Sequence, residues 1–282
     1  MNPAIVYDGS IRDSGSPFYT RVALANVLRE DPDWFTEAGD IPSDHPFRIH
    51  PDDGRDDLSV DKIPHPWGYW IVDSHLGPDI RLEKARKADI VWCAQKPFVD
   101  VLAKHGIKAS WLPLACEPEL HRITRFRPNS PDKDLVFVGH LQDPKMTNRI
   151  EFLDALLKTV KEPWFEYGVF HDEMANVYAR GRIGVNHAVR DDLNMRFFEL
   201  ACIGVPQLAD IRMVGLEELG FKPWVHYLPY STVEEAIEVV EDELYSEHSS
   251  MVTNSRQAVI ESHTYTHRVR QMLRDATNRG YL

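Results

Sequence analysis

The sequence has little cysteine and no long apolar run. Its 282 residues include three cysteines, Cys93, Cys116 and Cys202, without the CxxC spacing of metal or redox sites. This usage favours reduced core residues over a disulfide framework. No stretch approaches the ~18–20 apolar residues that cross a bilayer. The first residues lack the basic and apolar regions of a secretory signal, so we expect a soluble, cytoplasmic protein.

Basic residues are also in deficit. Lys and Arg total 32 against 44 Asp and Glu, which gives a formal net charge of −12. This balance disfavours non-specific binding to nucleic acid, because such binding needs a basic surface. Hydrophobic residues make up 43% of the chain and charged residues 27%, and these proportions are typical of a folded protein rather than a disordered one.

Short apolar runs alternate with helical patterns along the chain, which is typical of an α/β fold with parallel sheets. The first half contains predicted strands at 5–7, 67–73, 89–93 and 109–114. Residues 30–66 are rich in acids and proline, and we interpret them as irregular. The polar, proline-containing stretch 117–132 is the predicted linker to a second domain.

The second half opens with a predicted strand that ends in glycine, Phe137-Val138-Gly139. A glycine at a strand end lets the backbone approach a bulky ligand, and open α/β sheets bind ligands beyond the carboxyl ends of their strands. Lys145 and Arg149 follow and are candidate contacts for a diphosphate. Many α/β loops carry a lysine, so ordinary surface charge is the alternative interpretation.

A second element combines a predicted strand at 183–187, a polar loop and a helix with Asn194 as its candidate N-cap. The N–H groups at a helix N-terminus suit a phosphate, and Arg196 adds a fork of donors. Glu199 follows one turn later, where a carboxylate accepts both hydroxyls of a ribose, and Asp191 precedes the helix as a candidate contact for sugar hydroxyls. The alternative is a surface helix with an Arg196–Glu199 ion pair.

The pattern of Arg196, Glu199, Ala201, Gly204 and Pro206 resembles the donor-site helix of retaining glycosyltransferases with the GT-B architecture. More closely, the chain resembles the CgeB-like (spore maturation protein) glycosyltransferases over roughly residues 67–275. The segments that carry this resemblance are 137–139, 196–204, 215–219 and 263–268, together with 70–73 and 111–115 in the first half.

The resemblance implies a GT-B fold, with two Rossmann-like domains facing each other across a cleft. Residues 1–125 are then the acceptor-side domain, residues 132–262 bind the nucleotide sugar, and the final helix in 263–282 crosses back to the first domain. The implied reaction is metal-independent, retaining transfer of a sugar from a nucleoside-diphosphate donor to a glycan, protein, small molecule or nucleic acid. No cofactor is expected, because the nucleotide sugar is a substrate.

The resemblance also implies roles for single residues. Glu199 binds the ribose, Asp191 lies near the transferred sugar, and Lys145 and Arg196 face the diphosphate. His140 stands where related enzymes often carry Arg or a small hydroxyl residue, so its expected contact with the phosphates departs from the family's pattern. Gly139 and Asn194 complete the expected donor site.

Two other histidine patterns raise the questions of a catalytic base and of a metal site. His75 follows the strand that ends at Asp73 and is a candidate catalytic base, although a lone histidine is more often structural. His263 and His267 are four residues apart, as in a helical zinc pair, but they lack the HExxH pattern and a third ligand. We therefore predict no metal site.

Two other functions stay open. The first is a non-catalytic protein that binds a nucleotide sugar, because a fold does not fix a function. The second is a glycosyltransferase that acts on modified bases of nucleic acid. That enzyme needs a basic groove, for which the candidates are Arg81, Lys84, Arg86 and Lys87.

Overall fold

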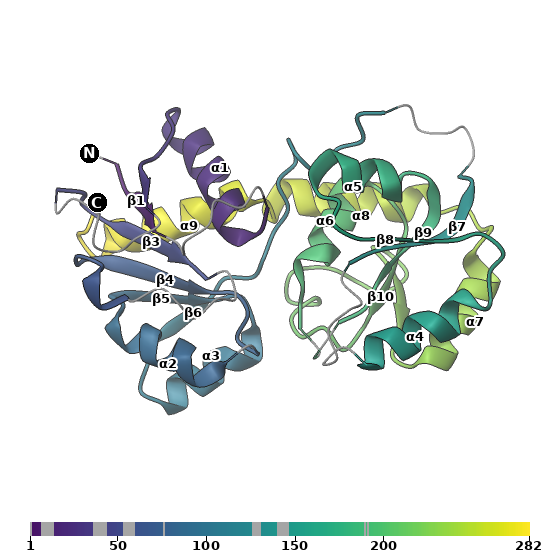
Figure 1. Ribbon diagram of the computed structural model, residues 1–282, viewed down its shortest axis with the longest axis horizontal. Helices are drawn as coiled ribbons and strands as arrows, with labels where there is room; N and C mark the ends of the chain where they lie inside the picture. Colours follow the sequence, from purple (N-terminus) through teal and green to yellow (C-terminus); the bar gives the residue numbers. More distant parts are fainter. Residues whose placement is uncertain are drawn as a thin grey trace. The chain divides into compact units, whose positions relative to one another are not determined.

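The chain divides into two compact units, Met1–Leu114 together with Tyr265–Leu282, and Ala115–Thr264. The computed structural model describes residues 2–6, 14–35, 44–52, 60–75, 77–125, 131–139, 147–188, 190 and 192–282. Each unit has one parallel sheet with helices on both faces (Figure 1), which is the doubly wound arrangement that the alternating pattern predicts.

The described part of the first unit holds a six-stranded sheet in the order β2-β1-β3-β4-β5-β6. Its strands are β1 (Ala4–Val6), β2 (Trp34–Phe35), β3 (Arg48–Pro51), β4 (Trp67–Ile71), β5 (Ile90–Cys93) and β6 (Ala109–Trp111). One face carries α1 (Ser16–Leu28) and α9 (Tyr265–Asn278), and the other carries α2 (Pro78–Lys87) and α3 (Lys96–Lys104) (Figure 1). The short 3-10 helix η2 (Val60–Lys62) precedes β4.

Successive residues of β4 serve opposite faces of this sheet, as the two-residue period of a strand requires. Tyr69 and Ile71 belong to the core beneath α2 and α3. Trp70 meets Tyr265 of α9 edge to face, with ring centroids 5.9 Å apart. Helix α9 is therefore part of the first unit, although it lies at the end of the chain.

Strand β3 lies between β1 and β4, within the segment 30–66 that the sequence led us to expect as irregular. That expectation was wrong because polar side chains interrupt the apolar pattern. Arg48 and His50 are only 1% and 2% exposed, and each has a backbone partner. His50 Nδ1 donates to the carbonyl oxygen of Val6 at 2.8 Å, so burial leaves that nitrogen satisfied.

The second unit has a parallel sheet in the order β11-β10-β9-β7-β8. The strands are β7 (Lys133–Val138), β8 (Pro163–Glu166), β9 (Gly181–Asn186), β10 (Gln207–Asp210) and β11 (Leu228–Tyr230). The helices are α4 (Thr147–Leu157), α5 (His171–Tyr178), α6 (Met195–Ile203), α7 (Val233–Glu243) and α8 (Ser249–Ser262). Leu135 and Phe137 of β7 face the core under α4 and α7, while Val136 and Val138 face the core under α5 and α6.

Two features of this unit differ from what the sequence predicted: an additional helix and the position at which the unit begins. Helix α8 was not predicted, because its sequence is rich in serine and buries only Met251, Ser255 and Val259. The unit also begins at Ala115, ahead of the predicted linker. The reason is that Cys116 N–H donates to the carbonyl oxygen of His263 at 3.2 Å, which ties the start of the unit to its end.

The four basic residues of α2 do not form an exposed basic groove. Arg81 forms a buried ion pair with Asp52, with Nε 2.9 Å from Oδ2 and each side chain 1% exposed. Lys84 is buried as well, and Lys87 pairs with Asp61 at 2.8 Å. Most of the positive charge expected for an acceptor groove is therefore buried or paired with acidic residues within the fold.

We predict that Arg81→Met destabilises the first unit by about 3–5 kcal/mol, because it leaves the Asp52 carboxylate buried without its partner. Arg86→Met on the same helix changes an exposed side chain and is expected to cost less than about 0.5 kcal/mol. Urea unfolding followed by tryptophan fluorescence measures both, since only Trp164 and Trp224 lie outside this unit. Equal effects of the two substitutions would contradict the assignment.

Candidate functional site

The carboxyl ends of β7 and β9 mark the point at which the second sheet reverses its winding. Strand β8 lies on one side of β7, whereas β9, β10 and β11 follow on the other. The connections that leave β7 and β9 therefore run in opposite directions and open a crevice between them, where sheets of this kind bind their ligands. Gly139 follows β7, and Asn186 ends β9.

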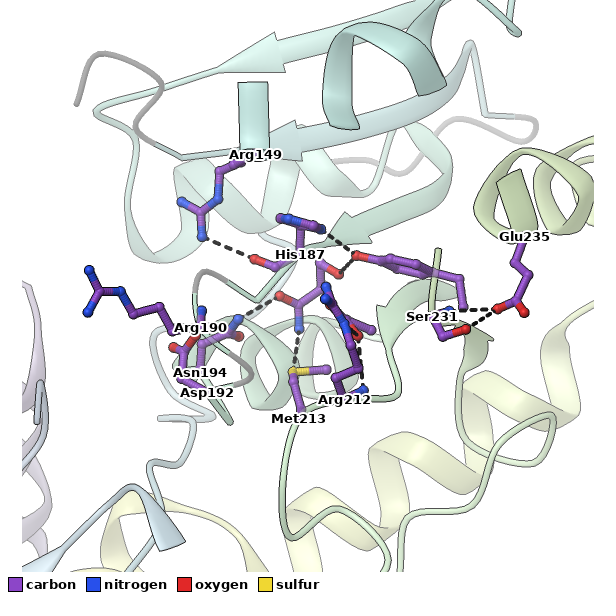
Figure 2. Close-up of polar contacts among 12 residues, drawn as sticks. Arg149, His187, Arg190, Asp192, Asn194, Arg212, Met213, Ser231 and Glu235 are labelled. Atoms are coloured by element: carbon purple, nitrogen blue, oxygen red, sulfur yellow. Dashed lines mark hydrogen bonds and ion pairs between the residues drawn. The ribbon is translucent and has the colours of Figure 1, made fainter. Parts of the chain in front are cut away.

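Helix α6 begins at this edge of the sheet, and Asn194 is its N-cap, as the sequence predicted. The Asn194 side chain accepts a hydrogen bond from Phe197 N–H at 3.2 Å. Its Nδ2 donates to Asn186 Oδ1 at 3.0 Å, so one side chain joins the start of the helix to the end of β9 (Figure 2). No acidic residue lies in the first turn of α6, which leaves the positive end of the helix dipole available to an anion.

Glu199 is buried one turn into α6, with a side chain that is 4% exposed. Its Oε2 lies 3.5 Å from Arg196 Nε, and its Oε1 lies 3.4 Å from His121 Nε2. The Arg196 guanidinium also contacts Met174 Sδ and lies 5.5 Å from the ring centroid of Tyr178. The Arg196–Glu199 pair considered for a surface helix is present, with Glu199 buried and Arg196 half-buried.

His187 follows β9 and has a defined tautomer. Tyr230 O–H donates its single proton to the carbonyl oxygen of Asn186 at 3.0 Å, so the 2.9 Å contact between His187 Nδ1 and Tyr230 Oη requires the nitrogen to donate. Nε2 of His187 is therefore an acceptor. Burial lowers the pKa of His187 to about 4, which keeps the ring neutral at pH 7.

Arg149 approaches the same strand end from α4. Its Nη2 donates to the carbonyl oxygen of His187 at 3.0 Å, as Figure 2 shows, and its guanidinium lies 5.8 Å from the ring centroid of Phe137. Burial lowers the pKa of Arg149. A cation of this kind, held by the backbone beside a strand end, gives the edge of the sheet a fixed positive charge.

A pocket of about 290 Å³ opens beside His187, between α4 and the start of α7. The Phe152 ring stacks on His187 with centroids 4.3 Å apart and forms part of its wall. Glu151, Arg212 and Ser231 contribute the polar lining. It lies on the α4 face of the sheet, whereas Glu199 belongs to α6, which covers the opposite face.

The structure brings together five of the residues predicted from the sequence. Gly139, Arg149, Asn194, Arg196 and Glu199 all belong to the second unit and to the elements at the carboxyl edge of its sheet. His140, Lys145 and Asp191 lie outside the described residues.

Two further observations concern Gly139 and His75. Gly139 has a packing reason to be glycine, since an added Cβ atom would lie 2.9 Å from the Phe137 ring. His75 follows β4 and belongs to the first unit.

Sequence reasoning missed two polar residues that hold this edge together, His121 and Tyr230. The hydroxyl of Tyr230 bridges two residues of another strand end, and His121 comes from a segment that we had predicted to be a linker. The available signal for Tyr230 was its place at the end of a strand next to β10. For His121 the sequence offered no local signal.

Asp132 and Asp134, two acids separated by one residue, have partners within the fold, and the two histidines with zinc-like spacing do not share a helix. Asp132 forms an ion pair with Arg180, and Asp134 Oδ2 accepts from the N–H groups of Lys161 and Glu162. His263 ends α8, whereas His267 lies in α9. Among the described residues no group of three or more His, Cys, Asp and Glu side chains is placed to hold a metal ion.

Comparison with known families matches residues 147–274 to a family described as Glycosyl transferase-like. The matched stretch contains α4, α6, Arg196 and Glu199. No curated protein matches the sequence. Within the described residues, no helix is both long enough and apolar enough to span a membrane.

The fold is shared with solved glycosyltransferase structures. Sucrose-phosphate synthase from Thermosynechococcus elongatus has a TM-score of 0.65 at 12% identity, with 99% of each chain covered. HepE from Anabaena, in complex with UDP-glucose, has a TM-score of 0.71 at 10% identity, with 98% of this chain and 99% of HepE covered. An α,α-trehalose-phosphate synthase from Burkholderia xenovorans gives 0.61 at 11%, with coverage of 92% and 78%. The chain thus has the predicted α/β GT-B fold.

We predict that His187 is protonated on Nδ1 and titrates near pH 4. Because the unfolded chain takes up this proton at the ordinary pKa of ~6.5, the histidine's contribution to folding stability is lost as pH falls from about 6.5 to 4. Long-range ¹H–¹⁵N spectra at a series of pH values report both tautomer and pKa. A midpoint near 6.5, or a proton on Nε2, would contradict the Tyr230 network.

Proposed function

We propose that the protein is a glycosyltransferase that moves a sugar from a nucleoside-diphosphate donor to an acceptor. One observation carries this proposal: Glu199, which is buried and paired with the half-buried Arg196, lies in a helix whose N-terminus meets the crevice of the second sheet. The match to the glycosyltransferase-like family covers the same stretch. The narrower assignment to the CgeB-like enzymes is proposed from the sequence resemblance.

In this proposal the donor nucleotide binds at the carboxyl edge of the second sheet. Glu199 accepts the ribose hydroxyls, and the diphosphate lies at the N-terminus of α6 near Arg196, where backbone N–H groups and the helix dipole favour negative charge. Arg149 adds positive charge at the neighbouring strand end. Lys145 and His140 are proposed on the phosphate side and Asp191 beside the sugar, from their positions in the sequence.

Departure of the nucleoside diphosphate is the step that these positive groups would assist. As the bond from the anomeric carbon to the leaving oxygen breaks, negative charge grows on the diphosphate and an oxocarbenium-like charge grows on the sugar. Fixed donors and cations stabilise the growing negative charge without reorganising. We propose that they serve in place of a metal ion, that no cofactor is needed, and that the anomeric configuration is retained. His75 is the proposed acceptor-side base.

The nucleotide base of the donor and the cellular compartment of the protein are proposed from two further observations. HepE, which shares the fold, has a solved complex with UDP-glucose, and this makes UDP the first nucleotide to test. The three cysteines are buried and reduced, as is usual in the cytoplasm, where we propose that the protein acts.

We predict that the protein binds one of UDP, GDP, ADP and TDP in calorimetric titrations without added metal, and that UDP binds most tightly. Glu199→Gln is expected to weaken this binding about 10–100-fold, because hydrogen bonds to a charged group contribute about 1.5–3 kcal/mol. The control is Glu162→Gln, which changes a carboxylate at the opposite, amino-terminal edge of the same sheet. Equal loss in both variants would remove Glu199 from the site.

Turnover separates an enzyme from a non-catalytic binder. We predict slow hydrolysis of the bound UDP-sugar without acceptor, unaffected by EDTA. With UDP-glucose, ¹H NMR should show α-glucose before mutarotation if the configuration is retained. If β-glucose is the first product, the reaction inverts the anomeric configuration instead. Binding without any turnover, with or without a panel of sugar acceptors, would favour the non-catalytic alternative.

A further inference from the structure

His121 is held in place by the backbone at the start of the second unit. Its N–H donates to the carbonyl oxygen of Glu117 at 2.8 Å, which closes a single turn, and its side chain is fully buried. Cys116, just before this turn, donates a backbone hydrogen bond to His263 of the same unit. The imidazole therefore has little freedom to move relative to α6.

The contacts of the ring fix where its proton lies. Glu117 N–H donates to His121 Nδ1 at 3.0 Å, and a backbone N–H has no acceptor role, so Nδ1 carries the lone pair. The neutral ring then carries its proton on Nε2. Burial lowers the pKa of His121 to about 4, so this tautomer persists at neutral pH. The tautomer is opposite to that of His187.

The proton on Nε2 faces Glu199. Nε2 lies 3.4 Å from Glu199 Oε1, while Arg196 Nε lies 3.5 Å from Oε2. Among the described residues, one nitrogen thus lies close to each carboxylate oxygen, and the two nitrogens come from different parts of the chain. Each oxygen has two lone pairs, so each keeps one acceptor position for a ligand, which matches the two adjacent hydroxyls of a ribose.

A neutral hydrogen-bond donor suits the position beside Glu199 Oε1 better than a second cation would. The imidazole N–H contacts the carboxylate without adding charge, so within the described part of the chain Arg196 is the one cation paired with Glu199. Donors in fixed geometry on rigid elements hold a binding group in its productive orientation. His121 is therefore placed to set the plane of the carboxylate.

We propose that His121 is a positioning residue, which orients the Glu199 carboxylate to accept the 2′- and 3′-hydroxyls of the donor ribose. The inference rests on the proposed function, since it assigns Glu199 to the ribose. It adds a residue from outside the predicted donor motif, and it makes recognition of the ribose diol depend on an imidazole tautomer.

The test compares UDP with 2′,3′-dideoxy-UDP, which lacks both hydroxyls, by calorimetry on the wild type, His121→Phe and His121→Gln. The wild type should prefer UDP by at least about tenfold. His121→Phe keeps an aromatic ring without the N–H, and it should weaken UDP about tenfold while changing dideoxy-UDP little. His121→Gln retains an N–H donor at the end of the side chain and should restore most of the preference.

A measurement on the wild type does not depend on how the variants fold. The Nε2–H resonance of His121 should be present in the free protein and should shift on adding UDP but not dideoxy-UDP. A proton on Nδ1, or equal loss of affinity for both nucleotides in His121→Phe, would overturn the inference while leaving the proposed function standing. If the wild type binds neither nucleotide, the proposed function fails and the inference fails with it.

Discussion

Burial of the Glu199 carboxylate is the constraint on which the arrangement of the second unit's site depends. An ionised carboxylate removed from water costs several kcal/mol unless charged or hydrogen-bonding groups surround it. Arg196 approaches it from the preceding turn of α6 and His121 from the start of the unit. Arg196 is in turn packed on Tyr178, whose hydroxyl accepts from Val138 N–H at 3.0 Å. The carboxylate is thereby tied to strand β7 of the sheet.

A second network of hydrogen bonds fixes the start of α6 relative to the strand ends that border the crevice. Asn194 joins the first turn of α6 to Asn186 at the end of β9, and Tyr230 joins the same strand end to β11 and His187. Figure 2 shows the contacts of Asn194 and His187 at the ends of the strands. The helix N-terminus and the strand ends are consequently held by side chains whose polar atoms already have partners. Such a framework presents a fixed set of donors to an anionic ligand, and fixed donors are what electrostatic stabilisation of a leaving diphosphate requires.

The sequence predicted the parts of this structure that rest on local patterns. The strand that ends at Gly139 is an apolar run because β7 is buried on both faces of its sheet. Asn194 is an N-cap because its short side chain reaches the next N–H groups. Strand β3 was hidden because Arg48 and His50 find polar partners within the fold. The role proposed for His121 depends on its contact with Glu199, a residue far along the chain, and no local pattern encodes that contact.

A structure with UDP bound tests the central claim most directly, because the second unit also has a pocket away from Glu199. The account predicts that the ribose hydroxyls lie within hydrogen-bonding distance of Glu199 and that the diphosphate lies at the N-terminus of α6. Nucleotide found in the pocket between α4 and α7, beside Phe152 and His187, would contradict it. In that case the buried Glu199 and its partner Arg196 would have a structural role, and the binding site would be assigned to the residues around His187.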